Sequence, residues 1–356
     1  MEVDDLSVEY STSTGITQVL KNVSLTLEKG KILGVVGESG SGKSTLGLSM
    51  MGLLPNNARI TTGEIWLREK IVLNKDIAEF DSVRGTGVSM IFQEPLNSLN
   101  PVYKVGYQLA EAVWVRDARK KGTPTNDLQV GPVDYSKAKR PSKAEMFSSL
   151  FSRVKITEEI KREIVGLLRA VRISDPEGVI NKYPHELSGG MRQRVMIAIS
   201  LALRPDVLVA DEPTTALDVT TQAKVLFLIK QLAKEYNTAV MLISHDLSVV
   251  SEVADDCQVM YLGEVVERSS SSTMFNRPLH PYTTGLLGSI PRTYVDEELL
   301  MPIPGSIPDP SNPPGGCRFH TRCPKAMDIC RTVEPKPVTI NETFVTCHLY
   351  NEGFHN

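Results

Sequence analysis

Long hydrophobic runs are missing from this sequence of 356 residues. The best candidate, residues 195–203, ends at Arg204, whereas a membrane span needs roughly 18 apolar residues or more. The first residues, 1–5, are acidic and have no apolar core, so they do not predict a signal peptide. We therefore expect a cytosolic chain whose association with a membrane comes only through a partner.

Net charge is also low, at −3, which gives no reason to expect nucleic acid as the main partner. Cysteine is scarce in most of the chain, where only Cys257 occurs, and we interpret this residue as a small buried hydrophobe. The other four cysteines crowd near the C-terminus, where a reducing cytosol favours a metal or cluster site over disulfides. They are Cys317, Cys323, Cys330 and Cys347.

The spacing of these four cysteines is C-x5-C-x6-C-x16-C. It matches neither the paired C-x2-C of a zinc ribbon nor the cysteine run of a ferredoxin. Four thiolates suit zinc or an iron–sulfur cluster equally well. The residues alone therefore leave both open, together with free thiols or disulfides.

A glycine-rich stretch lies between an apolar strand, residues 32–36, and the start of a helix. It fits the G-x-x-x-x-G-K-[ST] phosphate-binding pattern in the strand–turn–helix context that the pattern requires. Glycines let backbone N–H groups turn towards phosphate oxygens, and the helix N-terminus adds positive potential. Lys43 would reach the β- and γ-phosphates, and the Ser44 hydroxyl would bind Mg2+. The stretch comprises Gly37, Glu38, Ser39, Gly40, Ser41, Gly42, Lys43, Ser44 and Thr45.

Two polar residues at strands each have two interpretations. Tyr10 lies in an alternating N-terminal strand. It is either a half-buried aromatic, which spacing alone favours, or a platform on which a nucleotide base stacks. Gln93 ends a buried strand predicted at residues 87–93. It could cap the strand end, or it could coordinate a metal and sense nucleotide.

The middle of the chain reads as irregular sequence followed by helices. Residues 113–155 lose periodicity and become basic and turn-rich, which indicates an insertion or long mobile loop with a solvated surface. An amphipathic helix then begins with Thr157 as its N-cap. Ser188 caps another helix, where Gly189 and Gly190 leave backbone N–H groups available to an anion. An ordinary serine-capped helix is the alternative.

Carboxylates and a histidine follow two further apolar strands. Asp211 and Glu212 come directly after residues 207–210, and ligands of open α/β sheets bind at such strand ends. The Asp could hold Mg2+, and the Glu could orient and deprotonate an attacking water. His245 follows the strand 240–244 and could contact a γ-phosphate at the same rim. Solvated loop residues are the alternative in both cases.

Together these motifs resemble an ABC transporter ATPase over residues 1 to about 265, in the order of that family. The four-residue run Leu-Ser-Gly-Gly at 187–190 is specific to this family among P-loop proteins. The resemblance identifies Tyr10 as the aromatic that stacks on adenine, residues 37–44 as Walker A, Gln93 as the Q-loop residue, Asp211 and Glu212 as Walker B with the catalytic base, Asp218 as part of the D-loop, and His245 as the switch histidine.

The resemblance implies an α/β fold of the P-loop ABC type. It has a RecA-like core with an antiparallel β subdomain and a helical subdomain, in a nucleotide-binding domain of residues 1–265. It also implies ATP and Mg2+, with Ser44, Gln93 and Asp211 at the metal and Glu212, His245 and Gln93 in catalysis. ATP would lie between Walker A of one subunit and Ser188, Gly189 and Gly190 of another.

Two further stretches, residues 92–101 and 277–283, resemble the ATPases of dipeptide, oligopeptide and nickel importers. The region 266–356 is similar to the C-terminal extension of that family, in which some members carry a 4Fe–4S cluster on cysteines. This resemblance implies such a cluster on Cys317, Cys323, Cys330 and Cys347, with zinc as the alternative. The long insertion at 113–155 departs from the family pattern.

The implied function is ATP hydrolysis that powers peptide import, with oligosaccharide or nickel import as the alternative. The implied partners are a second ABC ATPase that is a paralogue, two integral-membrane permease subunits and an extracellular solute-binding protein. The chain would lie peripherally on the cytoplasmic face of the cell membrane. A chromosome-organising ABC ATPase is disfavoured because no long heptad region separates the two nucleotide motifs.

Overall fold

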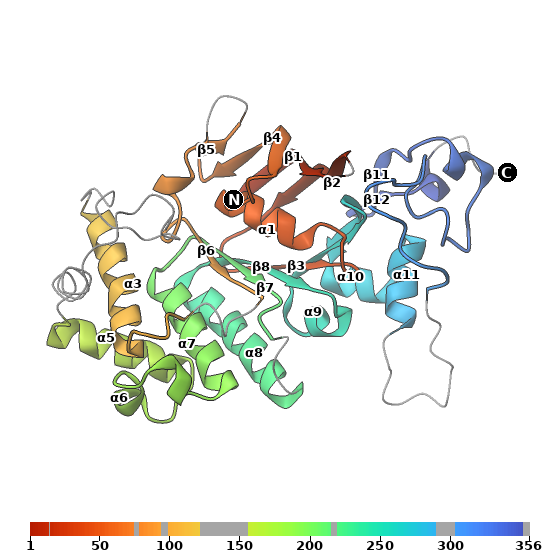
Figure 1. Cartoon of the computed structure of the whole chain (residues 1–356). Coiled ribbons are helices and arrows are strands. Elements are labelled where there is room, and N and C mark those ends of the chain that lie inside the picture. Colours follow the sequence, from red (N-terminus) through yellow and green to blue (C-terminus); the bar gives the residue numbers. More distant parts are fainter. Residues whose placement is uncertain are drawn as a thin grey trace. The chain divides into compact units, whose positions relative to one another are not determined.

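The computed structural model describes residues 1–13, 15–74, 78–93, 99–121, 156–214, 219–289 and 303–351. The chain divides into two compact units (Figure 1). The first comprises residues 1–90, 206–212 and 229–356, and the second comprises residues 91–205 and 213–228. In the described part of the chain, no helix combines the length and the hydropathy that a membrane span needs.

An antiparallel sheet of four strands in the order β2-β1-β4-β5 forms part of the first unit. The apolar positions that the alternation predicted, Leu6 and Val8 of β1 and Val23 and Leu25 of β2, are buried because one face of the sheet packs on a hydrophobic core, although Ser7 between the first two is buried as well. That core includes Leu6 and Val8 of β1 and Leu46 and Met50 of the first helix. The elements are β1 (Glu2–Thr12), β2 (Gly15–Thr26), β4 (Ala58–Leu67), β5 (Lys70–Leu73) and α1 (Lys43–Met51).

A larger sheet of eight strands has the order β11-β12-β10-β9-β3-β8-β7-β6. Strand β3 pairs in parallel with both β8 and β9, and β8 pairs in parallel with β7. Every residue of β3, β7 and β8 is buried, as the apolar runs predicted. The strands are β3 (Ile32–Val36), β6 (Val88–Ile91), β7 (Val207–Asp211), β8 (Ala239–Ser244), β9 (Asp256–Tyr261), β10 (Glu264–Ser270), β11 (Pro337–Ile340) and β12 (Thr343–Thr346).

The C-terminal part of the chain continues this larger sheet. Strand β12 pairs with β10 through Glu267↔Val345 and Arg268↔Phe344, and it forms a hairpin with β11. The expected domain boundary between residues 265 and 266 falls within β10 and stays a prediction. Besides α1, the described helical elements that lie wholly in the first unit are η1 (Phe80–Ser82), α9 (Leu247–Val253), α10 (Ser271–Asn276), α11 (Pro281–Gly288), η3 (Asp328–Arg331) and η4 (His348–Tyr350).

The second unit is helical in its described part. Thr157 caps α5 by accepting a hydrogen bond from the N–H of Ile160 at 3.3 Å, as predicted. The helices are α3 (Val105–Lys120), α5 (Glu158–Ala170), α6 (Pro176–Val179), η2 (Pro184–Glu186) and α7 (Gly189–Ala202), and α8 (Val219–Tyr236) begins in this unit.

The start of the expected irregular region was wrong. The sequence predicts that it begins at about Val113, but α3 continues to Lys120. Val113 and Val115 are buried in this unit, and the buried Arg116 forms an ion pair with Glu163 of α5 at 3.0 Å. Packing therefore overrides the weak periodicity of the sequence, while the rest of the predicted insertion, residues 122–155, lies outside the described residues.

Candidate nucleotide site

The phosphate loop joins β3 to α1, as the sequence predicted. Gly37 and Gly42 have φ values of +154° and +96°, which residues with a Cβ rarely adopt. A Cβ on Gly37 would lie 2.2 Å from the carbonyl oxygen of Met260, and one on Gly42 would lie 2.7 Å from Leu20 Cδ2. Both positions therefore require glycine for conformation and for space.

Lys43 lies buried inside this loop at the start of α1. Its Nζ donates hydrogen bonds to the carbonyl oxygens of Gly37 and Glu38, both at 2.8 Å, and to Ser41 Oγ at 3.2 Å. Burial lowers the pKa of Lys43, and the carboxylates of Glu212, Asp211 and Glu38 oppose that shift. The carbonyl and hydroxyl oxygens of the loop thus hold the Lys43 ammonium group at the place where a phosphate would bind.

Asp211 ends β7 and is buried beside Ser44. Burial raises the pKa of Asp211, whereas a hydrogen bond with the Ser44 side chain lowers it. The Oδ1 atom of Asp211 has no hydrogen-bond partner among the described residues. A hydroxyl and an unsatisfied carboxylate oxygen are donors that Mg2+ accepts, so this pair fits the expected ion.

Glu212 and His245 meet at the ends of two neighbouring parallel strands. The Nδ1 atom of His245 lies 2.9 Å from Glu212 Oε1, and the N–H of Glu212 donates to the carbonyl oxygen of Ile243 at 3.0 Å. Glu212 has a φ of +45°, which costs a residue with a side chain roughly 1–2 kcal/mol. Strained residues of this kind cluster at functional sites.

Tyr10 lies near the C-terminal end of the phosphate loop. Its hydroxyl is 3.5 Å from Thr45 Oγ1, and its ring packs partly buried against the core of the first unit. This position fits a half-buried strand aromatic and also fits a ring beside a bound nucleotide.

The other predicted nucleotide contacts belong to the second unit. Ser188 caps α7 by accepting from the N–H of Met191 at 3.4 Å, and Gly189 and Gly190 are its first residues, as predicted. A Cβ on Gly189 would meet nothing within 4 Å, so the backbone at this helix start is open. Gln93 is exposed just after β6. Asp218 lies outside the described residues.

The four C-terminal cysteines lie in one small part of the first unit. The N–H of Cys317 donates to the carbonyl oxygen of Cys330 at 2.8 Å. Burial, and to a smaller extent the other cysteines, raises the pKa of Cys317 to about 12 and that of Cys347 to about 11. Among the described residues, no group of three or more His, Cys, Asp or Glu side chains is arranged to hold a metal ion. The arrangement therefore does not confirm the expected cluster.

Sequence reasoning missed two residues that hold the phosphate loop. The N–H of Glu38 donates to the Tyr282 hydroxyl at 2.9 Å, and the Glu38 carboxylate accepts from Arg322 at 2.6 and 3.0 Å. These partners lie 244 and 284 residues further along the chain. No motif or periodicity links positions so far apart, so only the fold could reveal them.

Comparison with known proteins gives two family matches, one to the ABC transporter family over residues 20–215 and one to the oligopeptide/dipeptide transporter C-terminal region over residues 266–330. The oligopeptide transport ATP-binding protein AppD of Bacillus subtilis is 42% identical over 354 residues, covering 99% of this chain and 97% of that protein. The oligopeptide transport ATP-binding protein OppD of Salmonella typhimurium is 40% identical over 335 residues, with 94% and 89% covered.

Among solved structures, the ATP-binding cassette MJ0796, in a dimeric post-hydrolysis state bound to ADP and Pi, has a TM-score of 0.56 to this chain. The two are 25% identical, and the match covers 76% of this chain and 98% of that one. The expected cassette fold is thereby confirmed. The chain belongs to the ABC transporter family of ATPases, in the branch that carries the oligopeptide/dipeptide transporter C-terminal region.

Proposed function

We propose that this chain hydrolyses ATP to power the import of peptides, as the nucleotide-binding subunit of an ABC transporter. One observation carries the proposal: proteins named for oligopeptide and dipeptide transport are similar along nearly the whole chain, including the C-terminal extension. Oligosaccharide and nickel import remain outcomes of the test below.

We propose the following roles at the phosphate end of the nucleotide. Lys43 exchanges its loop carbonyls for the β- and γ-phosphates, and the glycines and Ser39, Ser41 and Thr45 present the loop around them. Bound Mg2+ neutralises phosphate charge, held by Ser44, Asp211 and Gln93. The unpartnered Oδ1 of Asp211 beside Ser44 supports this ligand pair.

We propose Glu212 as the general base that orients and deprotonates the attacking water. Its 2.9 Å contact with His245 supports a shared role, in which the histidine fixes the carboxylate and faces the γ-phosphate. Tyr10 stacks on adenine, which its position beside Thr45 supports.

The proposed reaction requires two subunits. Ser188, Gly189, Gly190 and Asp218 of one subunit complete the site around the phosphate loop of the other. The open helix start at Gly189 supports this arrangement, since backbone N–H groups there can bind an anion. Binding of ATP would then close the dimer, and hydrolysis would release it.

The partner subunits, the location and the domain division of this chain are proposals of the same kind. We propose a paralogous ATPase as the second subunit, with two permease subunits, a solute-binding protein and a peripheral position on the cytoplasmic membrane face. We also propose that the chain divides into a nucleotide-binding domain, residues 1–265, and an extension, residues 266–356. The two family matches fall on either side of this boundary.

A 4Fe–4S cluster on the four C-terminal cysteines is a separate proposal, and its support is the chemistry of four thiols gathered in one part of the fold. Protein purified anaerobically should then be brown, absorb near roughly 400 nm and contain iron, and Cys323→Ser should remove these signals while Cys257→Ser keeps them. Colourless, iron-free wild-type protein would refute the cluster.

The experiment that tests transport uses the full complex, in which this chain is purified with the proposed permease subunits and reconstituted into vesicles with the proposed solute-binding protein. ATP-dependent uptake of labelled peptides is expected, and Lys43→Met should abolish it. Lys31→Met, which changes an exposed lysine of the same unit, is the matched control. Uptake of oligosaccharide or nickel without peptide would overturn the assignment of substrate, and the absence of ATP hydrolysis would overturn the proposed function itself.

A further inference from the structure

The C-terminal extension holds the phosphate loop at Glu38, a residue inside the Walker A motif. Arg322 Nη1 and Nη2 donate to the two carboxylate oxygens of Glu38 at 2.6 and 3.0 Å, which is a bidentate pair. The Tyr282 hydroxyl accepts from the backbone N–H of the same residue at 2.9 Å. The extension therefore contacts both the backbone and the side chain of one loop residue.

Further contacts fix the Arg322 side chain, one from the extension and one from β9. Its side chain is only 4% exposed, its Nε donates to the carbonyl oxygen of Pro304 at 3.1 Å, and its guanidinium lies 5.9 Å from the ring centre of Tyr261. Tyr261, Tyr282 and Phe319 meet in edge-on or tilted contacts at 4.7–5.2 Å, which build a rigid wall beside it. Because the Arg322 guanidinium is buried and held in place, its electrostatic attraction to the Glu38 carboxylate has a fixed direction, and bulk salt screens this attraction little.

Glu38 contacts both Arg322 and the lysine that is proposed to bind phosphate. Its carbonyl oxygen accepts from Lys43 Nζ at 2.8 Å, while its N–H and carboxylate are held by the extension. Three different groups of one residue are thus fixed from two sides. Without Arg322, or without the Glu38 carboxylate that it binds, the extension no longer fixes the side chain of the residue whose carbonyl oxygen contacts Lys43, so the geometry of the loop around Lys43 is less well defined.

We propose that Arg322 is a positioning residue for ATP binding: through Glu38 it holds the phosphate loop open to phosphate, so that the C-terminal extension sets the ATP affinity of the site. This inference rests on the proposed function, because it assumes that the loop binds ATP. It assigns the extension an action on the nucleotide site of its own chain.

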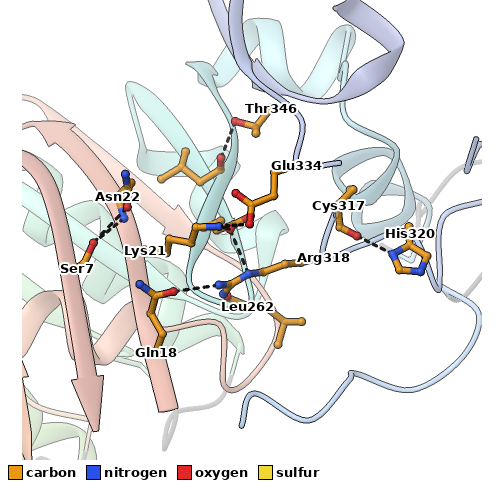
Figure 2. Close-up of polar contacts among 12 residues, drawn as sticks. Ser7, Gln18, Lys21, Asn22, Leu262, Cys317, Arg318, His320, Glu334 and Thr346 are labelled. Carbon is orange, nitrogen blue, oxygen red and sulfur yellow. Dashed lines mark hydrogen bonds and ion pairs between the residues drawn. The ribbon is translucent and has the colours of Figure 1, made fainter. Parts of the chain in front are cut away.

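A second arginine of the same turn provides a matched control. Arg318 is also buried, and it anchors the extension to the β9–β10 turn and to β2 rather than to Glu38. It donates to Gln18 Oε1 at 3.4 Å and to the carbonyl oxygen of Leu262 (Figure 2). It also forms an ion pair with Glu264 Oε1 at 3.1 Å. Among the described residues, its hydrogen bonds and ion pairs do not go directly to the phosphate loop, so its loss tests the anchoring of the extension rather than the hold on Glu38.

The experiment measures the Kd for Mg–ATP by calorimetry on the full chain, together with KM and kcat, for Arg322→Met, Glu38→Gln, the double variant and Arg318→Met. Arg322→Met should raise Kd and KM by roughly 10-fold or more, the usual size for loss of an outer partner of a binding group, with kcat at saturating ATP nearly unchanged. The double variant should bind no worse than Arg322→Met, because the two residues act as one unit. Arg318→Met should change Kd by less than about twofold while it lowers the thermal stability of the chain.

A folded Arg322→Met protein that binds ATP as tightly as the wild type would overturn the inference and leave the proposed function intact. Glu38→Gln decides the matter if Arg322→Met fails to fold, since it removes the acceptor from the loop side and leaves the extension unchanged. Wild-type affinity in that variant would overturn the inference equally. If the wild type binds no ATP, the proposed function falls, and this inference falls with it.

Discussion

Replacement of Glu212 by glutamine is the most direct test of the catalytic assignment. The amide has the shape of the carboxylate and can keep the 2.9 Å contact with His245. The φ of +45° at this position strains glutamine as much as glutamate, because both side chains carry a Cβ. The free energy of unfolding should therefore change by only about 0.5 kcal/mol.

The chemical step should suffer far more than stability. Loss of a positioned general base costs about 10²–10⁴-fold in rate, which corresponds to about 2.7–5.4 kcal/mol of transition-state stabilisation. ATP affinity should be equal or slightly higher, because the substitution removes one of the carboxylates near Lys43 and near the expected γ-phosphate. The variant is thus expected to bind ATP and to accumulate in the bound state.

The assay compares phosphate release at saturating Mg–ATP with calorimetric ATP binding, on the same preparations. Glu28→Gln makes the same chemical change at an exposed residue of the same unit and should leave both quantities unaltered. Parental turnover in Glu212→Gln, with ATP bound, would remove Glu212 from the role of general base.

Three further predictions concern stability and loop geometry. Gly42→Ala should weaken ATP binding and should lower the free energy of unfolding, measured in urea, by at least about 1–2 kcal/mol. The reason is that φ is +96° at this position and that Leu20 and Val19 leave no room for a Cβ. The control is Gly166→Ala, which should not lower this free energy, because a Cβ there would meet nothing within 4 Å. Arg116→Met should lower that free energy by about 1–3 kcal/mol because the partly buried Glu163 loses its hydrogen bonds from Arg116 and keeps only the contact with Arg204 at 3.5 Å, and exposed Arg162→Met serves for comparison. Burial lowers the pKa of His280 to about 3 from 6.5. As pH falls below 6.5, the unfolded chain therefore takes up a proton at this residue and the folded chain does not. Between pH 6.5 and 5 the free energy of unfolding of the wild type should fall by about 2 kcal/mol more than that of His280→Asn, which keeps a capping acceptor for the N–H of Tyr282. Equal pH dependence of these two proteins would show that His280 is not held neutral.

The parts of the site that the sequence could predict depend on local signals. Strands β3, β7 and β8 are fully buried, so each reads as an unbroken apolar run, and the functional residues follow directly at their ends. The cap residues Thr157 and Ser188 were predictable for the same reason, since a cap acts on N–H groups within three residues of itself.

What the sequence could not predict depends on tertiary packing. The last turns of α3 mix apolar with charged residues, and the ion pair of the buried Arg116 with Glu163 sustains the helix to Lys120. The bond of Arg322 to Glu38 joins positions 284 residues apart, and charge pairs leave no periodic trace along a chain. The pairing of β12 with β10 was equally hidden, because short strands at the C-terminus have no signal that names their neighbour.

That last pairing bears on any attempt to shorten this protein. Strand β12 covers the hydrogen-bonding groups along one side of β10, and β11 in turn covers β12. A chain cut after residue 265 would lose β12 together with most of β10. The antiparallel partner of β9 would be gone, and an uncovered strand of this kind readily pairs with another molecule. Truncated versions are therefore expected to self-associate, so the contribution of the extension is better dissected by point substitutions than by deletion.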